Sequence, residues 1–159
     1  MPPRMSSLAK ELSAIHGISP TPQIAVAFLK SSPIFRGQLK GPIRAIWSCK
    51  ADRLKSTVAN LRYPKRGAPT IKVNRDIVRG CRLDLFLDVI IHELIHLKVD
   101  QAAGRAQRWV DGAVSQDDAS HHGVSFLAEM DRINKVFQRN VLVKFEGEFP
   151  KLCRLYIYR

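Results

Sequence analysis

The sequence predicts an α+β protein in which a small sheet packs against several helices. Apolar residues recur at spacings of three and four in separate segments, which is the period of helices that face a core. Short β-prone runs lie between residues 41 and 73, and hydrophobic (45%) and charged (25%) residues are in the usual globular balance. No Pro-, Gly- or Ser-rich linker divides the 159 residues, so we expect one domain over residues 1–159.

Two short helices are expected at the start of the chain. Ser6 and Ser7 are both favourable N-caps for the first, and Gly17 with Pro20 marks its end. Thr21 followed by Pro22 combines a capping side chain with a proline at the first helical position. The second helix should therefore begin there and end before Pro33.

Three strands should follow these helices. The β-prone runs cover residues 43–49, 56–63 and 69–73, and charged or Gly/Pro-containing turns separate them. We expect these runs to form the small sheet.

Two longer helices and a terminal region complete the prediction. Apolar residues between Leu83 and Val99 form the stripe of a helix packed into a core, and a second stripe runs from Phe126 to Phe137. Residues 141–145 and 152–158 have the composition of strands, so we predict terminal strands or a tail over residues 141–159.

The first of these two helices contains the sequence His92-Glu93-Leu94-Ile95-His96. The i, i+4 spacing brings both imidazoles to one helix face, which suits a single zinc ion, and Glu93 lies beside them as a candidate general base. The alternative is a chance match with two ordinary, partly buried histidines. In so apolar a helix, however, two imidazoles and a carboxylate would be costly to bury without partners.

A catalytic zinc site needs a third protein ligand and an open position. His121 and His122 are the main candidates because they precede the predicted helix that starts near Phe126. Glu129 is a weaker candidate, since such a residue is more often an exposed helix charge. A third histidine directly after the motif is excluded, because Val99 and Ala102 occupy those places.

The charge of the chain is strongly positive, with 26 Lys and Arg against 14 Asp and Glu and a net charge of +12. Thirteen basic and two acidic residues lie between Arg36 and Arg82, so this segment carries 13 − 2 = +11. Such an excess favours phosphate-bearing partners, and nucleic acid is the natural one; the alternative is a basic surface that only keeps the protein soluble. At a predicted turn in this segment, the best candidates for phosphate contact are Arg62, Lys65 and Arg66.

Two aromatic residues also lie in the basic segment. Trp47 and Tyr63 could stack on bases, as aromatic side chains do in proteins that bind single strands. For Trp47 a place in the core beside the sheet is the favoured interpretation.

The chain resembles a SprT-like metallopeptidase domain, the group that includes the Spartan proteases acting on proteins crosslinked to DNA. Four features carry the resemblance: the strand 43–48 with Trp47, the strand 70–74, the His-Glu-Leu-Ile-His motif, and His122-Gly123-x-x-Phe126 followed by Ile133-Asn134. It spans about residues 20–140. It implies a zincin-like fold, one zinc ion held by His92, His96 and His122, and Glu93 as the catalytic residue.

The chain departs from that family at two places. The connection between His96 and His122 is 25 residues long, and residues 145–159 contain only Cys153 where many bacterial members end in a cysteine-rich zinc ribbon. The resemblance thus implies an endopeptidase for DNA-associated or DNA-crosslinked proteins, with DNA bound through residues 36–82. The alternatives are a nucleic-acid-binding module with a structural or vestigial zinc, and a zinc hydrolase with a non-peptide substrate such as RNA.

The sequence also bears on the compartment. Residues 1–17 lack the uninterrupted apolar core of a secretory signal, and Cys49, Cys81 and Cys153 are odd in number and widely spaced. We expect an intracellular protein with reduced thiols, in the cytoplasm or nucleoid, or in the nucleus of a eukaryote. No apolar run approaches the roughly 20 residues of a membrane span, so no membrane partner is expected.

Overall fold

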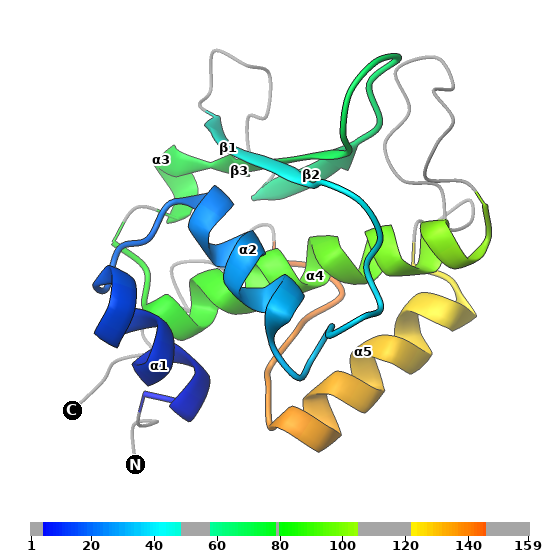
Figure 1. Ribbon diagram of the computed structural model, residues 1–159. Coiled ribbons are helices and arrows are strands. Elements are labelled where there is room, and N and C mark those ends of the chain that lie inside the picture. Colours follow the sequence, from blue (N-terminus) through cyan, green and yellow to red (C-terminus); the bar gives the residue numbers. More distant parts are fainter. Residues whose placement is uncertain (1–4, 49–57, 79, 105–121, 146–159) are drawn as a thin grey trace.

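The computed structural model describes residues 5–48, 58–78, 80–104 and 122–145. Over these residues the chain is a mixed α+β protein with a three-stranded sheet and several helices, as predicted (Figure 1). The elements, in chain order, are α1 (Ser7–His16), α2 (Pro22–Ser31), β1 (Arg44–Ser48), β2 (Ala59–Arg62), β3 (Thr70–Asn74), α3 (Arg75–Val78), α4 (Leu83–Ala102) and α5 (Val124–Phe137).

The caps of the first two helices form as the sequence predicts. The Ser6 side chain accepts a hydrogen bond from the amide of Ala9, and Gly17 ends α1 with a φ of 78°, where glycine is favoured. The Thr21 hydroxyl accepts from the amide of Ile24, with Pro22 at the first helical position. The two predicted helices are therefore confirmed.

The sheet has the strand order β1-β3-β2. β1 runs parallel to β3, with Ala45 opposite Ile71, and β2 runs antiparallel to β3, with Leu61 also opposite Ile71. Because β1 and β3 are parallel, the chain must cross over between them. It does so by way of β2, which lies on the side of β3 opposite to β1. The one-turn helix α3, which the sequence analysis did not predict, follows β3 at once; there the Asn74 side chain accepts from the amide of Asp76 at 3.1 Å.

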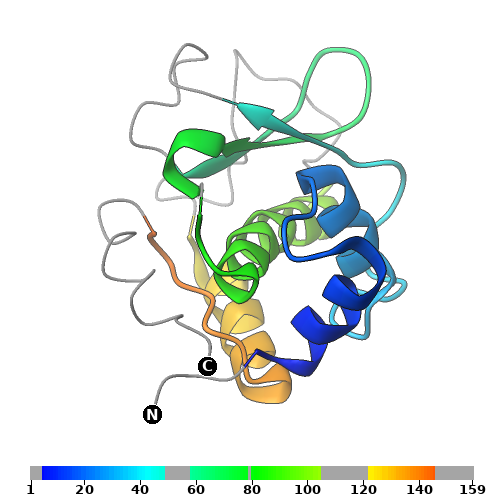
Figure 2. The same cartoon turned by 90° about the vertical axis from the view of Figure 1, so that its left-hand side faces the viewer.

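Helix α4 is the centre of the fold. It packs against the sheet at β2, against α1 and α2, and against α5, so helices and sheet enclose it (Figures 1 and 2). Every residue from Leu83 to Leu97 is buried, which goes beyond the stripe of a half-buried helix. Any polar side chain in this stretch is consequently held inside the protein.

The predicted strand over residues 141–145 is wrong, because the structure has no strand there. Its backbone groups bond to side chains instead of to a neighbouring strand. The Asn134 side chain forms hydrogen bonds to both the amide and the carbonyl of Val141, and the Leu142 carbonyl accepts a hydrogen bond from His92. The predicted strand over residues 152–158 lies outside the described residues.

Two aromatic residues of the basic segment pack inward. Trp47 is partly buried, and its ring stacks on Phe86 at a centroid distance of 5.6 Å, so the core interpretation is confirmed. Tyr63 is only 4% exposed, and its hydroxyl donates to Asp100 at 2.6 Å. Tyr63 therefore packs between β2 and α4 and leaves little of its ring exposed.

Candidate metal centre

His92 and His96 lie one turn apart on α4, on the same face of the helix, as the i, i+4 spacing requires. They are 7% and 5% exposed, and their ring centroids are 5.0 Å apart. Two polar rings are thus placed side by side in an otherwise apolar environment.

The tautomer of His92 is set by a backbone group. Its Nδ1 lies 2.7 Å from the carbonyl oxygen of Leu142, which can only accept, so Nδ1–H donates. The proton of the neutral ring therefore resides on Nδ1, and the lone pair of Nε2 points away from Leu142. A histidine that ligates a metal through one nitrogen commonly donates from the other in this way.

A third imidazole approaches from the segment just before α5. His122 Nε2 is 3.2 Å from His92 Nε2, and one ligand atom from each of His92, His96 and His122 lies within 4.8 Å of the others. The ring of Phe126, in the first turn of α5, packs against all three imidazoles at centroid distances of 4.4 to 4.9 Å. The three histidines therefore form a cluster, which we call the histidine cluster, with an apolar wall beside it.

The environment keeps His92 uncharged. Burial lowers the pKa of His92 to about 4, and the nearby His122 adds to this, whereas the bond to Leu142 opposes it. A neutral imidazole is the form that binds metal. Near neutral pH the cluster thus offers a lone pair at His92 without first losing a proton.

This donor set fits a metal ion. With its lone pair on Nε2, His92 must either accept a hydrogen bond from His122 Nε2 or share a cation with it. Two nitrogens bound at about 2.0–2.1 Å to a tetrahedral zinc lie about 3.4 Å apart, close to the 3.2 Å observed between the two Nε2 atoms. Two buried imidazoles from α4 and a partly buried one from the segment before α5 can therefore hold one metal ion.

Glu93 follows His92 directly on α4 and is 6% exposed. Its carboxyl group is thus held inside the protein next to the first histidine of the cluster.

The segment that carries Leu142 is held by Asn134 from the last half of α5. The Asn134 amide donates to the Val141 carbonyl at 3.0 Å, and its oxygen accepts from the Val141 amide at 2.8 Å. These two hydrogen bonds fix the backbone of Val141, and they thereby position the next carbonyl, that of Leu142, which orients His92. Asn134 belonged to the resemblance to the SprT-like family, but no pattern in the sequence predicted this contact.

Glu129, the weaker ligand candidate, pairs with basic residues and is not part of the cluster. Glu129 forms ion pairs with Lys98 at 2.7 Å and with Arg132, and the Lys98 pair ties α5 to α4. Burial would raise the pKa of Glu129, but the hydrogen bonds and charges of these two partners outweigh burial and hold it below its usual value. His121 lies outside the described residues, as do Cys49 and Cys153, while Cys81 is a partly buried thiol.

A second polar cluster lies near the start of α4 and was missed by the sequence analysis. Arg139 donates to Asp84 and to Asp88, both at 2.8 Å, and Ser6 also bonds to Asp84. We call this set the aspartate–arginine cluster. Arg139 lies 51 to 133 residues from its partners in sequence, so no local pattern could have predicted these contacts.

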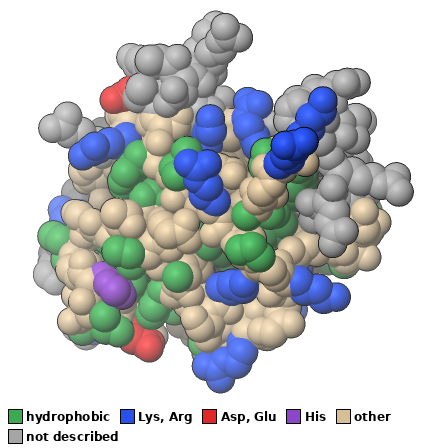
Figure 3. Space-filling model, turned by 45° about the horizontal axis from the view of Figure 1, so that its top comes forward, with side chains coloured by type: hydrophobic (Ala, Val, Ile, Leu, Met, Phe, Trp, Pro, Cys, Tyr) green, Lys and Arg blue, Asp and Glu red, His purple; other side chains and the backbone are tan. Residues whose placement is uncertain are grey.

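The three residues predicted to contact phosphate are all exposed. Arg62 ends β2, and Lys65 and Arg66 lie in the loop between β2 and β3. In Figure 3, which brings the sheet side forward, Lys and Arg side chains spread over the visible surface with little acidic surface beside them. Arg62, Lys65 and Arg66 are thus exposed and close together along the chain, and they are not members of the histidine cluster.

No protein-family model and no curated protein matches the chain. Among the described residues, no helix combines the length and the apolar character that crossing a membrane requires.

Proposed function

We propose that the chain is a zinc-dependent endopeptidase of the SprT-like kind. The observation that carries the proposal is the histidine cluster itself: two imidazoles of a HExxH motif on a buried helix and a third from a distant segment meet at one point. The buried helix beneath a small sheet is consistent with a zincin-like arrangement, which is part of the proposal.

Zinc is the metal that this donor set favours. Imidazole nitrogens suit zinc, and three protein ligands leave the fourth position that catalytic zinc sites keep for water or substrate. When bound there, zinc would act as a Lewis acid that polarises a carbonyl and acidifies water. His92, His96 and His122 would hold the ion, and Phe126 would exclude water from one side of it.

Glu93 is the proposed general base. Its carboxylate would take one proton from the attacking water while the oxygen forms a bond to the scissile carbonyl carbon. It would then deliver that proton to the leaving amine as the peptide C–N bond breaks. Atoms balance in this sequence, since one water and one peptide bond give a carboxyl and an amine.

The proposed substrates are proteins associated with or crosslinked to DNA. The support is electrostatic, because the 36–82 segment carries +11 and its residues Arg62, Lys65 and Arg66 are exposed together. A positive face would concentrate the enzyme on DNA, so that specificity arises from location. This predicts that DNA stimulates cleavage and that added salt removes the stimulation.

The test is cleavage of casein and of a DNA-bound basic protein, with and without DNA, by zinc-loaded wild type, Glu93→Gln and Glu11→Gln. Glu11 is exposed on α1 and serves as the matched control. We expect Glu93→Gln to keep its zinc and lose at least about a hundredfold in rate, since a positioned acid–base group contributes about 10²–10⁴-fold. Equal rates for wild type and Glu93→Gln would contradict the proposal.

The same protein should be incubated with labelled RNA. Cleavage of RNA and not of protein would replace the peptidase by a hydrolase of phosphodiesters. Zinc binding without hydrolysis of any of these substrates would instead favour a nucleic-acid-binding module with a structural zinc.

A further inference from the structure

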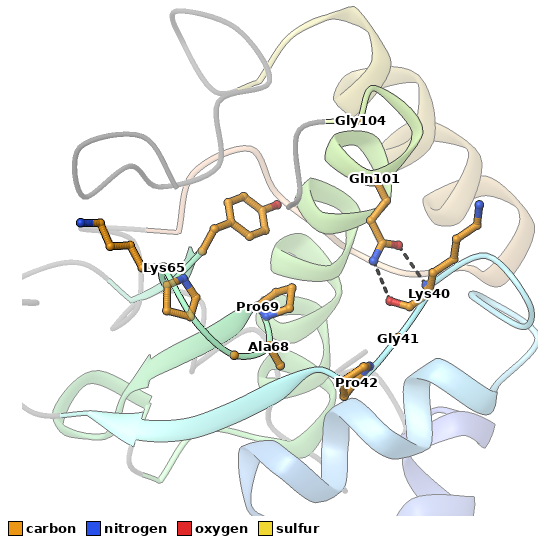
Figure 4. Close-up of a pocket in the computed structure, with 11 residues that line it drawn as sticks. Lys40, Gly41, Pro42, Lys65, Ala68, Pro69, Gln101 and Gly104 are labelled. Atoms are coloured by element: carbon orange, nitrogen blue, oxygen red, sulfur yellow. Dashed lines mark hydrogen bonds between the residues drawn. The ribbon is translucent and has the colours of Figure 1, made fainter. Parts of the chain in front are cut away.

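A cavity of about 770 Å³ opens at the carboxyl end of α4, outside the histidine cluster. One wall is the loop between β2 and β3, the other is the segment that leads into β1, and the last turn of α4 lies between them (Figure 4). This volume lies in the range of sites for small ligands, about 300–1,000 Å³. The lining residues are Lys40, Gly41, Pro42, Tyr63, Pro64, Lys65, Gly67, Ala68, Pro69, Gln101 and Gly104.

Both walls are fastened to adjacent residues of α4. The Tyr63 hydroxyl donates to Asp100 at 2.6 Å and so holds the start of the β2–β3 loop. The Gln101 side chain accepts from the Lys40 amide at 3.0 Å and donates to the Lys40 carbonyl at 2.8 Å, which holds the other wall. The cavity is therefore formed before any ligand arrives, and binding has little backbone ordering to oppose it.

The lining combines rigid apolar faces with positive charge. Pro42, Pro64 and Pro69 present pyrrolidine rings that lose no rotamer freedom when covered, and the described residues that line the cavity include no Asp or Glu. The floor is the carboxyl end of α4, where backbone carbonyls carry partial negative charge. A phosphate is thus disfavoured on the floor, whereas a flat group with N–H donors is suited to it.

The two lysines stand on opposite sides of the cavity. Lys65 and Lys40 are exposed, and their amines extend outward from the two walls (Figure 4). Arg62 and Arg66 are exposed close to Lys65 along the chain. A chain of phosphates that crosses the opening would meet an amine on each side of it.

We propose that this cavity holds one unpaired base of a single-stranded nucleic acid, while the phosphates on either side of that base contact Lys40 and Lys65. The inference rests on the nucleic-acid part of the proposed function and adds strandedness to it. A duplex cannot use the cavity, because its bases are paired and stacked. Single strands, in contrast, can place a base face against apolar side chains beside a basic groove.

The experiment measures fluorescence anisotropy of the wild-type chain with labelled oligothymidylate, with an abasic strand of the same length, and with a duplex. The abasic strand keeps the phosphates and lacks the bases. We expect it to bind at least about tenfold more weakly than oligothymidylate, the size of effect that one well-held base gives. Equal affinity for the two strands, or tighter binding of the duplex, would overturn the proposal.

Variants locate the site. Lys40→Glu and Lys65→Glu should each weaken single-strand binding several-fold and lower its salt dependence, whereas Lys135→Glu, the same change on exposed α5, should not. Ala68→Phe adds volume to the lining without a charge change and should reduce the preference over the abasic strand. If Lys135→Glu weakened binding as much as the two lining variants, the site would lie elsewhere.

The outcome is separable from the peptidase proposal. Glu93→Gln leaves the cavity untouched and should bind oligothymidylate like the wild type even though it does not cleave. A wild type that cleaves protein but shows no base preference overturns the cavity proposal alone. A wild type that binds no nucleic acid overturns both the cavity and the DNA-directed part of the function.

Discussion

Helix α4 carries two buried polar clusters that are built in opposite ways. In the aspartate–arginine cluster, charges of opposite sign meet: Arg139 is 3% exposed in its side chain and pairs with Asp88, at 1%, and with Asp84. In the histidine cluster, three groups of the same kind converge, and His92 presents the lone pair of its Nε2 toward His122. The first cluster is compensated from within the chain, whereas the second is suited to compensation by a cation.

The pKa shifts reflect this difference. Burial would raise the pKa of Asp84, but the hydrogen bonds from Ser6 and the charge of Arg139 outweigh it and hold that pKa below its usual value. Burial would likewise lower the pKa of Arg139, and the two aspartates raise it instead. For His92, burial prevails and the ring stays neutral. One cluster thus stabilises charges, while the other keeps His92 uncharged and able to bind a ligand from outside.

The largest expected effect is the loss of protein stability when the aspartate–arginine cluster is broken. Arg139→Met removes the cation and leaves two buried carboxylates, so the free energy of unfolding should fall by about 3–5 kcal/mol. Urea unfolding followed by circular dichroism measures it. A loss below about 1 kcal/mol would mean that water reaches Asp84 and Asp88, so that their charges do not depend on Arg139.

His92 should contribute to the pH dependence of the stability of the metal-free protein. The pKa of His92 is about 4 in the folded chain, against an ordinary value of 6.5, so between these values the unfolded chain carries a proton that the folded chain lacks. Unfolding therefore takes up a proton, and stability falls as pH decreases from 6.5 toward 4, by on the order of 3 kcal/mol at most. Urea titrations in chelator at pH 7, 6 and 5 test this, and an identical slope in His92→Gln would contradict it.

Replacing Asn134 should weaken metal binding at the histidine cluster and leave the aspartate–arginine cluster unchanged. Asn134→Ala frees the Val141 peptide and hence the Leu142 carbonyl that orients His92, so zinc affinity should fall about 10–100-fold. Competition with a chromophoric chelator measures this, and Asn140→Ala, an exposed asparagine in the same segment, is the control. If both variants bound zinc like the wild type, the Leu142 contact would have no role in orienting the ligand.

The smallest expected change in the free energy of unfolding comes from an exposed ion pair. Lys135 and Asp131 pair at 2.9 Å on α5, with side chains 75% and 60% exposed. Lys135→Met should change the free energy of unfolding by less than about 1 kcal/mol, because water screens such pairs. Comparing it with Arg139→Met in the same urea experiment shows how much of the latter effect comes from burial. A loss as large as that of Arg139→Met would remove burial as the explanation.

The sequence predicted the parts of the fold that depend on local pattern. The caps at Ser6 and Thr21 and the apolar period of α4 are encoded within a few residues of each other, and all three are confirmed. The strand predicted over residues 141–145 is wrong because their apolar, β-branched composition is only a local signal. The side chains of Asn134, seven residues away, and of His92, fifty residues away, bond to the backbone groups that a strand partner would need.

Contacts between distant segments lay beyond local pattern. Arg139 gives no sign in the sequence that it will meet Asp84 and Asp88, and Tyr63 gives none that it will bond to Asp100. His122 is the exception. Spacing alone left it level with His121, and the resemblance to a known family selected it; the structure brings it to His92 and His96.

The central claim is that the histidine cluster holds zinc, and the most direct test is metal content by elemental analysis. Zinc-supplemented wild type is compared with His92→Ala, His96→Ala and His122→Ala, with exposed His16→Ala and the neighbouring His121→Ala as controls, each checked for folding by circular dichroism. We expect about one zinc per chain in wild type and both controls and a loss of zinc in the three cluster variants. Well-folded wild type without zinc, or cluster variants that keep it, would contradict the account.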